Sequence, residues 1–164
     1  MKKTVFRLFS LLCVSIFMLT LTSAALAVDP ANIPPADEIS DNPNESFVDI
    51  QIYGPQGITS ITLINATCGI SKLSSSSVSC TASELANQVV LSIGSTIRLQ
   101  KYESGQWHNV TSASKTVVNS SSCSQSRTFN VVPGYYYRTY AFHIAENVSD
   151  SSSAYTMSKA ILVE

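Results

Sequence analysis

Apolar and polar residues alternate along most of the chain, and this period of two is typical of strands with one face in a core and one in solvent. In residues 46–53, the side chains of Val48, Ile50 and Ile52 fall on one face. Residues 54–57 (Gly-Pro-Gln-Gly) end that segment as a turn. No long stretch has the spacing of an amphipathic helix, so the pattern predicts an all-β domain.

The following segments continue the pattern with interruptions. The run 58–73 is rich in Ile and Thr, and its alternation changes phase, which predicts a β-bulge or a strand break near Asn65. A Ser-rich loop at 74–77 leads to a strand at 78–83. Residues 84–88 are the one place where a single helical turn is expected.

The clearest predicted hairpin lies in the middle of the chain. Alternating residues lead into a Ser-Gly turn at 104–105, and a second strand returns from it. A turn at this place puts Tyr102 opposite Trp107 and Leu99 opposite Val110. These are favourable cross-strand pairs.

The last part of the chain predicts further strands. The segment 119–126 is rich in Ser and is expected to be a long loop before a strand around Phe129. A Pro-Gly turn at 133–134 starts a strand over 135–145, and a final strand covers about 154–163. In 135–145 the even-numbered face is the more apolar one, with Tyr136, Tyr140, Phe142 and Ile144.

These segments add up to about seven strands at spacings near 8–12 residues, which is typical of an antiparallel sandwich or small barrel. The folded domain is expected to span residues 46–164. Before it, residues 28–45 hold four prolines and five acidic residues, which predicts an acidic, disordered linker. A binding tail is the alternative interpretation of that linker.

Residues 1–27 have the features of a signal peptide. The basic residues Lys2, Lys3 and Arg7 precede an apolar run, and the small residues Ala25 and Ala27 form the pattern at which signal peptidase cleaves. Cleavage after Ala27 predicts a secreted, extracellular protein that meets the membrane only through this segment. An uncleaved membrane anchor is the alternative, because the apolar run approaches the length of a membrane-spanning helix.

The charge balance excludes one class of partner. The whole chain has ten Lys and Arg and eleven Asp and Glu. Removing Lys2, Lys3 and Arg7 with the signal peptide leaves seven basic residues against eleven acidic ones, a net charge of about −4. Nucleic-acid binding needs a cluster of basic residues that the sequence does not contain, so nucleic acid is not an expected partner.

The segment VVPGYYYRTYAFHIA resembles a fibronectin type III module, in which a Pro-Gly turn leads into a strand that carries a tyrosine and ends in alanine. The matching residues are Pro133, Gly134, Tyr137, and Ala141 or Ala145. The resemblance implies an immunoglobulin-like sandwich of about seven strands. It also implies that the hydroxyl of Tyr137 forms a corner hydrogen bond.

The chain also resembles a group of small, uncharacterised secreted proteins of Gram-positive bacteria. The segments LQKYESGQW (99–107) and GYYYR (134–138), with a Ser-rich stretch between them, carry this resemblance together with the signal peptide. It implies an extracellular, sandwich-like domain of unknown function and no assigned activity.

Cysteine usage leaves two alternatives open. Cys13 falls within the signal peptide, and three cysteines follow it. If residues 73–76 close a hairpin, Cys68 and Cys80 lie opposite each other, and a cross-strand disulfide is geometrically allowed. The alternative is that they are free thiols in the core. Cys123 is expected to be free or exposed in a polar loop.

The sequence shows no arrangement that carries chemistry. Two histidines, His108 and His143, occur without metal-ligand spacing, and there is no nucleophile elbow or phosphate-binding loop. We therefore expect neither a metal nor a cofactor, and no enzyme. The alternative is a small secreted enzyme or inhibitor whose site depends on Cys123 or His143.

The aromatic residues are the remaining candidates for a site. Consecutive tyrosines on a strand point to opposite faces, so some of these rings must lie outside the core. The candidate binding surface consists of Tyr135, Tyr137 and Trp107, while the alternative for Trp107 is a place in the core. The expected function is a non-catalytic extracellular binding module for a protein or a cell-wall glycan.

Overall fold

The computed structural model describes residues 28–52 and 63–164. Within these ranges the chain forms one sheet of seven strands with antiparallel pairing, which confirms the predicted all-β antiparallel class. Two 3₁₀ helices precede the strands, η1 (Pro30–Asn32) and η2 (Ala36–Glu38). The strands are β1 (Glu45–Gln51), β2 (Leu63–Ser74), β3 (Ser77–Glu103), β4 (Gln106–Asn130), β5 (Tyr135–Glu146), β6 (Ser151–Met157) and β7 (Ile161–Val163).

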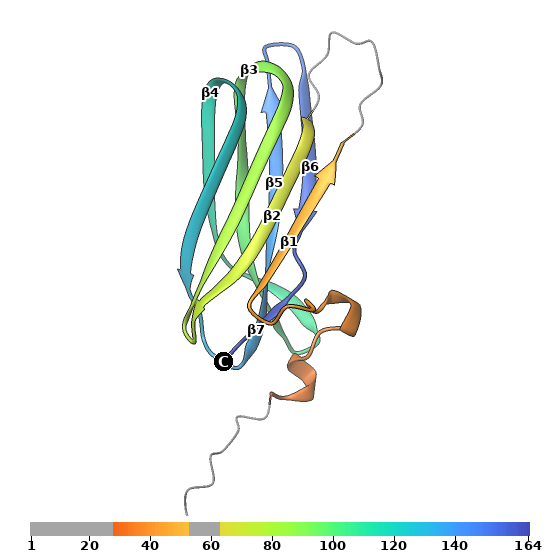
Figure 1. Ribbon diagram of the computed structural model, residues 1–164, viewed down its shortest axis with the longest axis vertical. Coiled ribbons are helices and arrows are strands. Elements are labelled where there is room, and N and C mark those ends of the chain that lie inside the picture. Colours follow the sequence, from red (N-terminus) through yellow and green to blue (C-terminus); the bar gives the residue numbers. More distant parts are fainter. Residues whose placement is uncertain (1–27, 53–62) are drawn as a thin grey trace, which may run out of the picture.

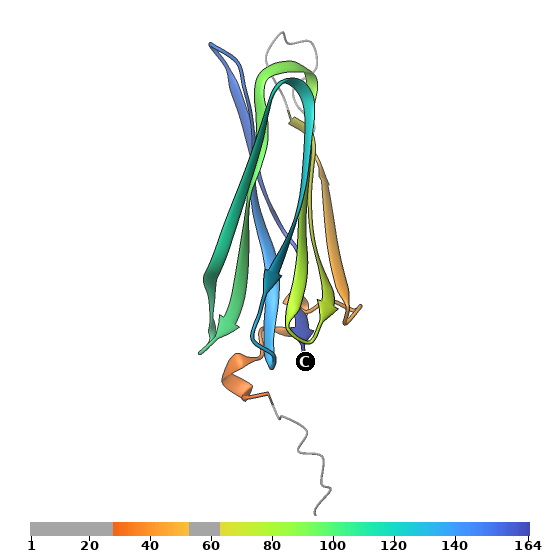
Figure 2. The same cartoon turned by 90° about the vertical axis from the view of Figure 1, so that its left-hand side faces the viewer.

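The sheet folds over into two layers because β3 and β4 are long enough to run through both (Figures 1 and 2). The first half of β3 pairs with β2 and its second half pairs with β5, while β4 follows β3 through both halves. The first layer therefore has the order β1-β2-β3-β4. The second layer has the order β4-β3-β5-β6, and β7 continues after β6 along β5.

Both long strands bend at the end of the molecule where they change layers, as Figure 2 shows. The pairing of β3 with β4 is interrupted between Leu85 and Val90, and Asn119 in β4 has a φ of 52°. Asparagine adopts this left-handed conformation more readily than most residues. Beyond the bend, a Cβ on Gly94 would collide with the backbone of Lys115 in β4. Glycine at this position therefore allows the two strands to stay paired.

Two local predictions are wrong at this bend. Residues 84–88, expected as a helical turn, and residues 119–126, expected as a loop, both belong to strands. Serine favours loops because its hydroxyl competes for backbone hydrogen bonds, but pairing between strands overrides this preference. Here the hydroxyls also bond across the ladder, for example Ser79 with Ser126 at 3.1 Å.

The core between the layers is built largely from small side chains. Two groups of buried apolar residues fill it, one around Ile97 and Leu99 and one around Leu63 and Ile93. Many other inner positions hold Ala or Cys: Ala66, Cys68, Cys80, Ala82, Ala141 and Ala145. Tyr137 is the large aromatic side chain within these two groups.

The less apolar, odd-numbered face of β5 is turned toward the core, and the more apolar, even-numbered face is turned outward. Tyr137, Thr139 and Ala141 are buried on its inner, odd-numbered face. The even-numbered residues are only half-buried on the outer surface of the second layer: Tyr136, Tyr140, Phe142 and Ile144. The prediction was wrong because large rings also shield one another on an outer face, so an apolar face need not be the inner one.

The predicted hairpin is confirmed at its turn. Ser104 and Gly105 have φ values of 53° and 80°, and Tyr102 lies opposite Trp107 with ring centroids 5.0 Å apart. One pair differs, because a register shift after Leu99 places that residue opposite Thr111. The irregularity expected near Asn65 is also present, as a register shift between Leu63 and Asn65. The single strand expected at 154–163 is divided into β6 and β7.

The acidic segment 28–45, which we expected to be disordered, lies against the folded domain, and we call it the N-terminal strap. Ala31 accepts a backbone hydrogen bond from Gly105 at 2.9 Å, and the backbones of Glu38 and Ser40 bond to Ala160 at 2.7 and 2.8 Å. Composition could not predict these contacts, because the strap is held mainly by hydrogen bonds rather than by burial of apolar side chains. In the described ranges no helix has the length and apolar character needed to cross a membrane.

Tyr137 ties β5 to the connection that precedes it. Its hydroxyl accepts a hydrogen bond from the N–H of Val132 at 3.1 Å and donates one to the carbonyl oxygen of the same residue at 2.9 Å. The ring is buried among the apolar residues of the core. Burial of the ring raises the pKa of this phenol above its ordinary value.

We predict that Tyr137→Phe lowers the free energy of unfolding by about 1 kcal/mol, because it removes these hydrogen bonds and keeps the ring. Urea unfolding measures the difference, with Tyr136→Phe on the outer face as the matched control. Equal stability of the two variants would contradict a structural role for the Tyr137 hydroxyl.

Candidate functional site

A group of polar side chains crosses the core and connects the layers. Glu84 from β3 and His143 from β5 meet with 2.8 Å between Oε2 and Nδ1, and His143 Nε2 lies 2.8 Å from the hydroxyl of Thr156 in β6. The three residues are 2%, 0% and 3% exposed, respectively. They form a buried chain from the first layer to the second.

Strand geometry explains why these side chains meet. Glu84 lies at an inner position of the first layer, directly opposite Cys123 in β4. Two further contacts of the same kind lie beside it. Gln125 Nε2 donates to the carbonyl oxygen and the hydroxyl of Ser95 at 2.8 and 2.9 Å, and Thr139 donates to the carbonyl oxygen of Gly69 at 2.9 Å. The layers are therefore joined by polar contacts as well as by apolar packing.

This arrangement brings together Cys123, Glu84 and His143, two of which were our candidates for a thiol- or His-dependent site. A nucleophile must be reachable and must ionise, and neither condition is met here. Burial raises the pKa of the Cys123 thiol to about 11, and the adjacent Glu84 carboxyl group adds to the rise. Both ring nitrogens of His143 are already engaged. The three side chains lie in the core between the layers.

The cysteine predictions are corrected by the register. Cys68 pairs with Ala82, and Cys80 pairs with Ile70, so the two cysteines are diagonal neighbours rather than opposite partners. Both are buried free thiols, as in the second alternative. Burial raises the pKa of each to about 11. Cys123 is also a free thiol, but it lies buried in strand β4 instead of in an exposed loop.

The three aromatic residues predicted to form a binding surface do not share one. Tyr137 is buried in the core, contrary to the prediction. Tyr135 is half-buried beneath the ammonium group of Lys101, which lies 4.3 Å from the ring centroid. Trp107 is half-buried at the hairpin end of the second layer, and the other histidine of the chain, His108, is exposed beside it. Tyr137 is buried because β5 turns its odd-numbered face, and not its even-numbered face, toward the core.

Trp107 belongs to a site that the strap occupies. Its indole N–H donates to Glu38 Oε2 at 2.7 Å, and Arg138 Nη1 lies 3.1 Å from the same oxygen. The guanidinium of Arg138 stacks 4.0 Å above the indole ring, and its Nε donates to Gln100 at 2.8 Å. Burial lowers the pKa of Arg138, and the Glu38 carboxylate opposes that shift. The outer face of the second layer thus binds one carboxylate of its own chain.

Further along the same face lies a row of rings that we call the aromatic strip: Tyr140, Phe142 and Tyr155. The ring centroid of Tyr155 is 5.6 Å from that of Tyr140 and 4.9 Å from that of Phe142. Tyr155 is 58% exposed, and the guanidinium of Arg98 lies 5.9 Å from the Tyr140 ring. Sequence reasoning missed this strip because it assigned the even-numbered face of β5 to the core.

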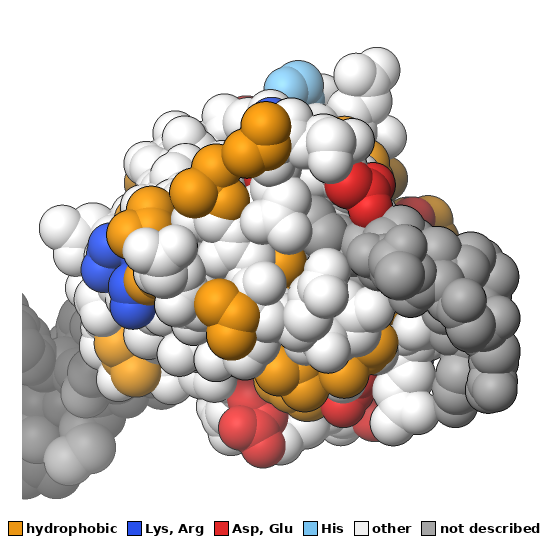
Figure 3. Space-filling view, turned by 90° about the horizontal axis from the view of Figure 1, so that it is seen from above, with side chains coloured by type: hydrophobic (Ala, Val, Ile, Leu, Met, Phe, Trp, Pro, Cys, Tyr) orange, Lys and Arg blue, Asp and Glu red, His pale blue; other side chains and the backbone are white. Residues whose placement is uncertain are grey.

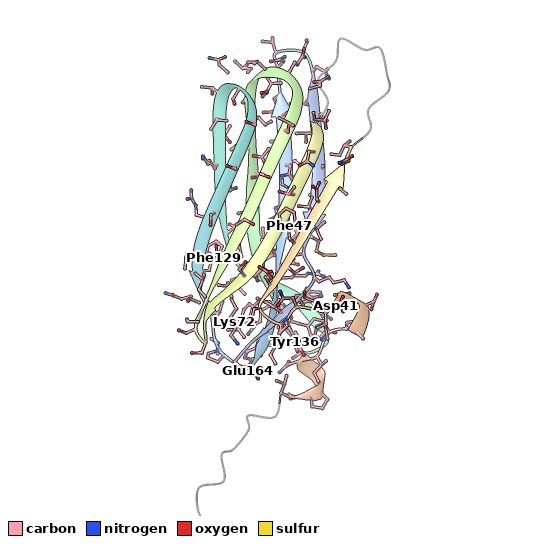
Figure 4. The ribbon with its side chains drawn as sticks, in the orientation of Figure 1. Asp41, Phe47, Lys72, Phe129, Tyr136 and Glu164 are labelled. Carbon is pink, nitrogen blue, oxygen red and sulfur yellow. The ribbon has the colours of Figure 1, made fainter. Side chains whose placement is uncertain are left out.

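The outer face of the first layer has a different character. A hollow of about 520 Å³ there is lined by hydroxyl-bearing residues of β2, β3 and β4 together with other residues, among them Phe47, Lys115 and Arg127. Phe47 is an isolated exposed ring on β1, and Figure 4 shows it well above Tyr136, which lies near the C-terminal Glu164. Among the described residues, the aromatic ring contacts lie on the second layer and not on this face.

The end of the molecule at the bend is a third exposed surface. Figure 3 shows hydrophobic side chains scattered over this end. Exposed aliphatic residues lie in the bends of β3 and β4 and in the connection between β5 and β6: Val89, Leu91, Val118 and Val148. These four side chains add exposed apolar area but carry no polar or charged group that would give specificity for a ligand.

Among residues 28–52 and 63–164, no three His, Cys, Asp or Glu side chains are grouped in a way that could hold a metal ion. The chain matches none of the protein-family models and none of the curated proteins with which it was compared. In the aromatic strip, Tyr155 is exposed, Tyr140 and Phe142 are half-buried, and the guanidinium of Arg98 lies beside the Tyr140 ring.

We predict that Cys68, Cys80 and Cys123 resist alkylation in the folded protein. A rise of the thiol pKa from 9.0 to about 11 lowers the thiolate fraction at pH 8 about a hundredfold, and burial blocks the reagent further. Mass spectrometry after timed iodoacetamide treatment measures this on the chain from Val28, with guanidinium-unfolded protein as control. Rapid modification of Cys123 in the folded protein would instead indicate an accessible thiol.

Proposed function

We propose that this chain is a secreted bacterial protein whose folded domain is a non-catalytic extracellular binding module. In this proposal residues 1–27, which lie outside the described ranges, are a signal peptide cleaved after Ala27, and the source is a Gram-positive bacterium. The binding surface is the aromatic strip on the outer face of the second layer. The observation that carries the proposal is the exposed ring of Tyr155 stacked beside Tyr140 and Phe142.

We also propose that the domain has the immunoglobulin-like arrangement of a fibronectin type III module. In such domains strands A, B and E share one layer, and C, F and G share the other, which can gain C′. If the halves of β3 are B and C and those of β4 are C′ and E, the observed pairing gives layers A-B-E and C′-C-F-G with β2 as A. This correspondence leaves β1 as an additional edge strand.

The hydrogen bonds of Tyr137 support this assignment independently. A tyrosine near the start of strand F whose hydroxyl bonds to backbone a few residues upstream is a feature of these sandwiches. Tyr137 lies near the start of β5 and bonds to Val132. Modules of this architecture present binding surfaces on a rigid scaffold, and a rigid sheet holds the aromatic strip in place here.

Binding modules concentrate their affinity in a few exposed aromatic and arginine side chains, which is the composition of this face. The buried Cys123, Glu84 and His143 cluster does not favour the alternative of an enzyme or inhibitor with a thiol- or His-dependent site. Its side chains are buried in the core, where Glu84 Oε2 and Thr156 engage the two ring nitrogens of His143.

We predict that the protein is retained by washed Gram-positive cell walls or by a component of culture supernatant, and that Tyr155→Ala reduces the retention about tenfold or more. A pull-down with quantification of the bound fraction measures it. The matched control is Phe47→Ala, which removes an exposed ring from the other layer. Equal retention of both variants, or no retention of the unaltered protein by either material, would overturn the proposal.

A further inference from the structure

We propose that the outer face of the second layer binds an acidic polysaccharide, with sugar rings on the aromatic strip and a sugar carboxylate on Arg98. This inference rests on the proposed binding function and adds the chemical class of the ligand. It is carried by three features of the face: a carboxylate already bound there, an arginine without an acidic partner, and polar groups that border the rings.

The strap shows how this face holds a carboxylate. Glu38 reaches it from outside the sheet and receives the indole N–H of Trp107 and the guanidinium of Arg138. Arg138 is held in position by Gln100 on one side and by the Trp107 ring beneath it. An arginine that lies over an aromatic ring therefore already serves as a carboxylate receptor on this surface. Such charge-assisted hydrogen bonds are among the strong ones.

Arg98 repeats part of this arrangement on the neighbouring strand. It lies on β3 directly opposite Tyr140 of β5, with its guanidinium 5.9 Å from the centre of that ring. Arg98 is exposed, and none of the described carboxylates forms a salt bridge with it. Arg138 has Glu38 as its partner, whereas Arg98 offers the same chemistry to a group from outside the molecule.

The surroundings of the rings favour a sugar as the carrier of that carboxylate. Tyr140, Phe142 and Tyr155 give a row of ring faces on a regular sheet, and the apolar faces of pyranose rings can stack on such a row. Hydroxyl and amide pairs lie across β3 and β4 on the same face, Thr96 with Ser114 at 2.9 Å and Gln100 with Asn109 at 3.0 Å. These groups can exchange hydrogen bonds with sugar hydroxyls.

A protein is the alternative occupant of this surface. Protein interfaces also have an apolar centre and a polar rim, so the feature that favours a sugar is the set of hydroxyl and amide groups beside the rings, which match a ligand rich in hydroxyl groups. The chain after Ala27 has a net charge of about −4, which repels an acidic ligand at long range. Attraction must therefore come from a positively charged group on this face. Arg98 is the group that provides it.

The test compares polygalacturonate with its methyl ester, which keeps the sugar ring and removes the charge. Affinity electrophoresis measures the retardation of protein produced from the full chain. We expect retardation by polygalacturonate that weakens with added salt, and much weaker retardation by the ester. We expect Arg98→Gln to reduce the affinity for polygalacturonate about tenfold, and Arg98→Lys to reduce it less.

Two control variants distinguish this inference from the proposed function. Tyr155→Ala should weaken binding to both polymers, while Arg127→Gln on the first layer should change neither. Arg98 and Arg127 are both exposed, so neither substitution should prevent folding, and circular dichroism checks this.

Equal retardation by both polymers, or no effect of Arg98→Gln, would overturn the inference that the ligand is acidic. The aromatic strip would still be a binding surface. Retention by cell walls with no retardation by polygalacturonate would overturn the inference in the same way. Capture of a supernatant protein that depends on Tyr155 would replace the polysaccharide by a protein ligand.

Discussion

The structure depends on one constraint: β3 and β4 remain paired while they cross from the first layer to the second. A hairpin of this length places its own two halves face to face; β2 and β5 pair with these halves, and β1, β6 and β7 extend the layers from β2 and β5. The crossing requires the interruption between Leu85 and Val90, the left-handed Asn119 and a glycine at 94. Because both strands pass from one layer to the other at this end, the layers stay joined there.

Contacts between the layers follow from that constraint. Small inner side chains fill the space between the sheets, and Glu84 with His143 and Gln125 with Ser95 bond across it. Buried polar pairs of this kind add little net stability, but removing one partner is costly because the other is left unsatisfied. We infer that they select one alignment of the layers. Tyr136, Tyr140, Phe142 and Tyr155 lie on the outer face of the second layer, where they can meet a ligand.

Local patterns in the sequence predicted the positions of strands and turns well, but they predicted less well which face of a strand lies in the core. Alternation and turn residues identified the hairpin at Ser104 and Gly105, the pairing of Tyr102 with Trp107 and the irregularity near Asn65. These features depend on neighbours in the chain. The inner face of β5, the strand character of 119–126 and the register of Cys68 depend on packing between distant segments. Hydrophobicity alone could not separate a core face from a face of mutually shielding rings.

The same limit applies to the site. Two of the predicted residues, Tyr135 and Trp107, remain partly exposed, but Arg98, Tyr140, Phe142 and Tyr155 come together only once β3, β5 and β6 are side by side. No short motif contains them. Glu38 illustrates the point further, because its partner Arg138 is a hundred residues away in the chain.

We propose that this outer face is where the protein meets its ligand. A titration of backbone amide NMR signals with an oligogalacturonate tests it residue by residue. We expect the perturbed signals to belong to Arg98, Tyr140, Phe142 and Tyr155 and their strand neighbours. Perturbations confined to the first layer around Phe47, or to the bend around Val118, with the signals of the aromatic strip unchanged, would contradict it.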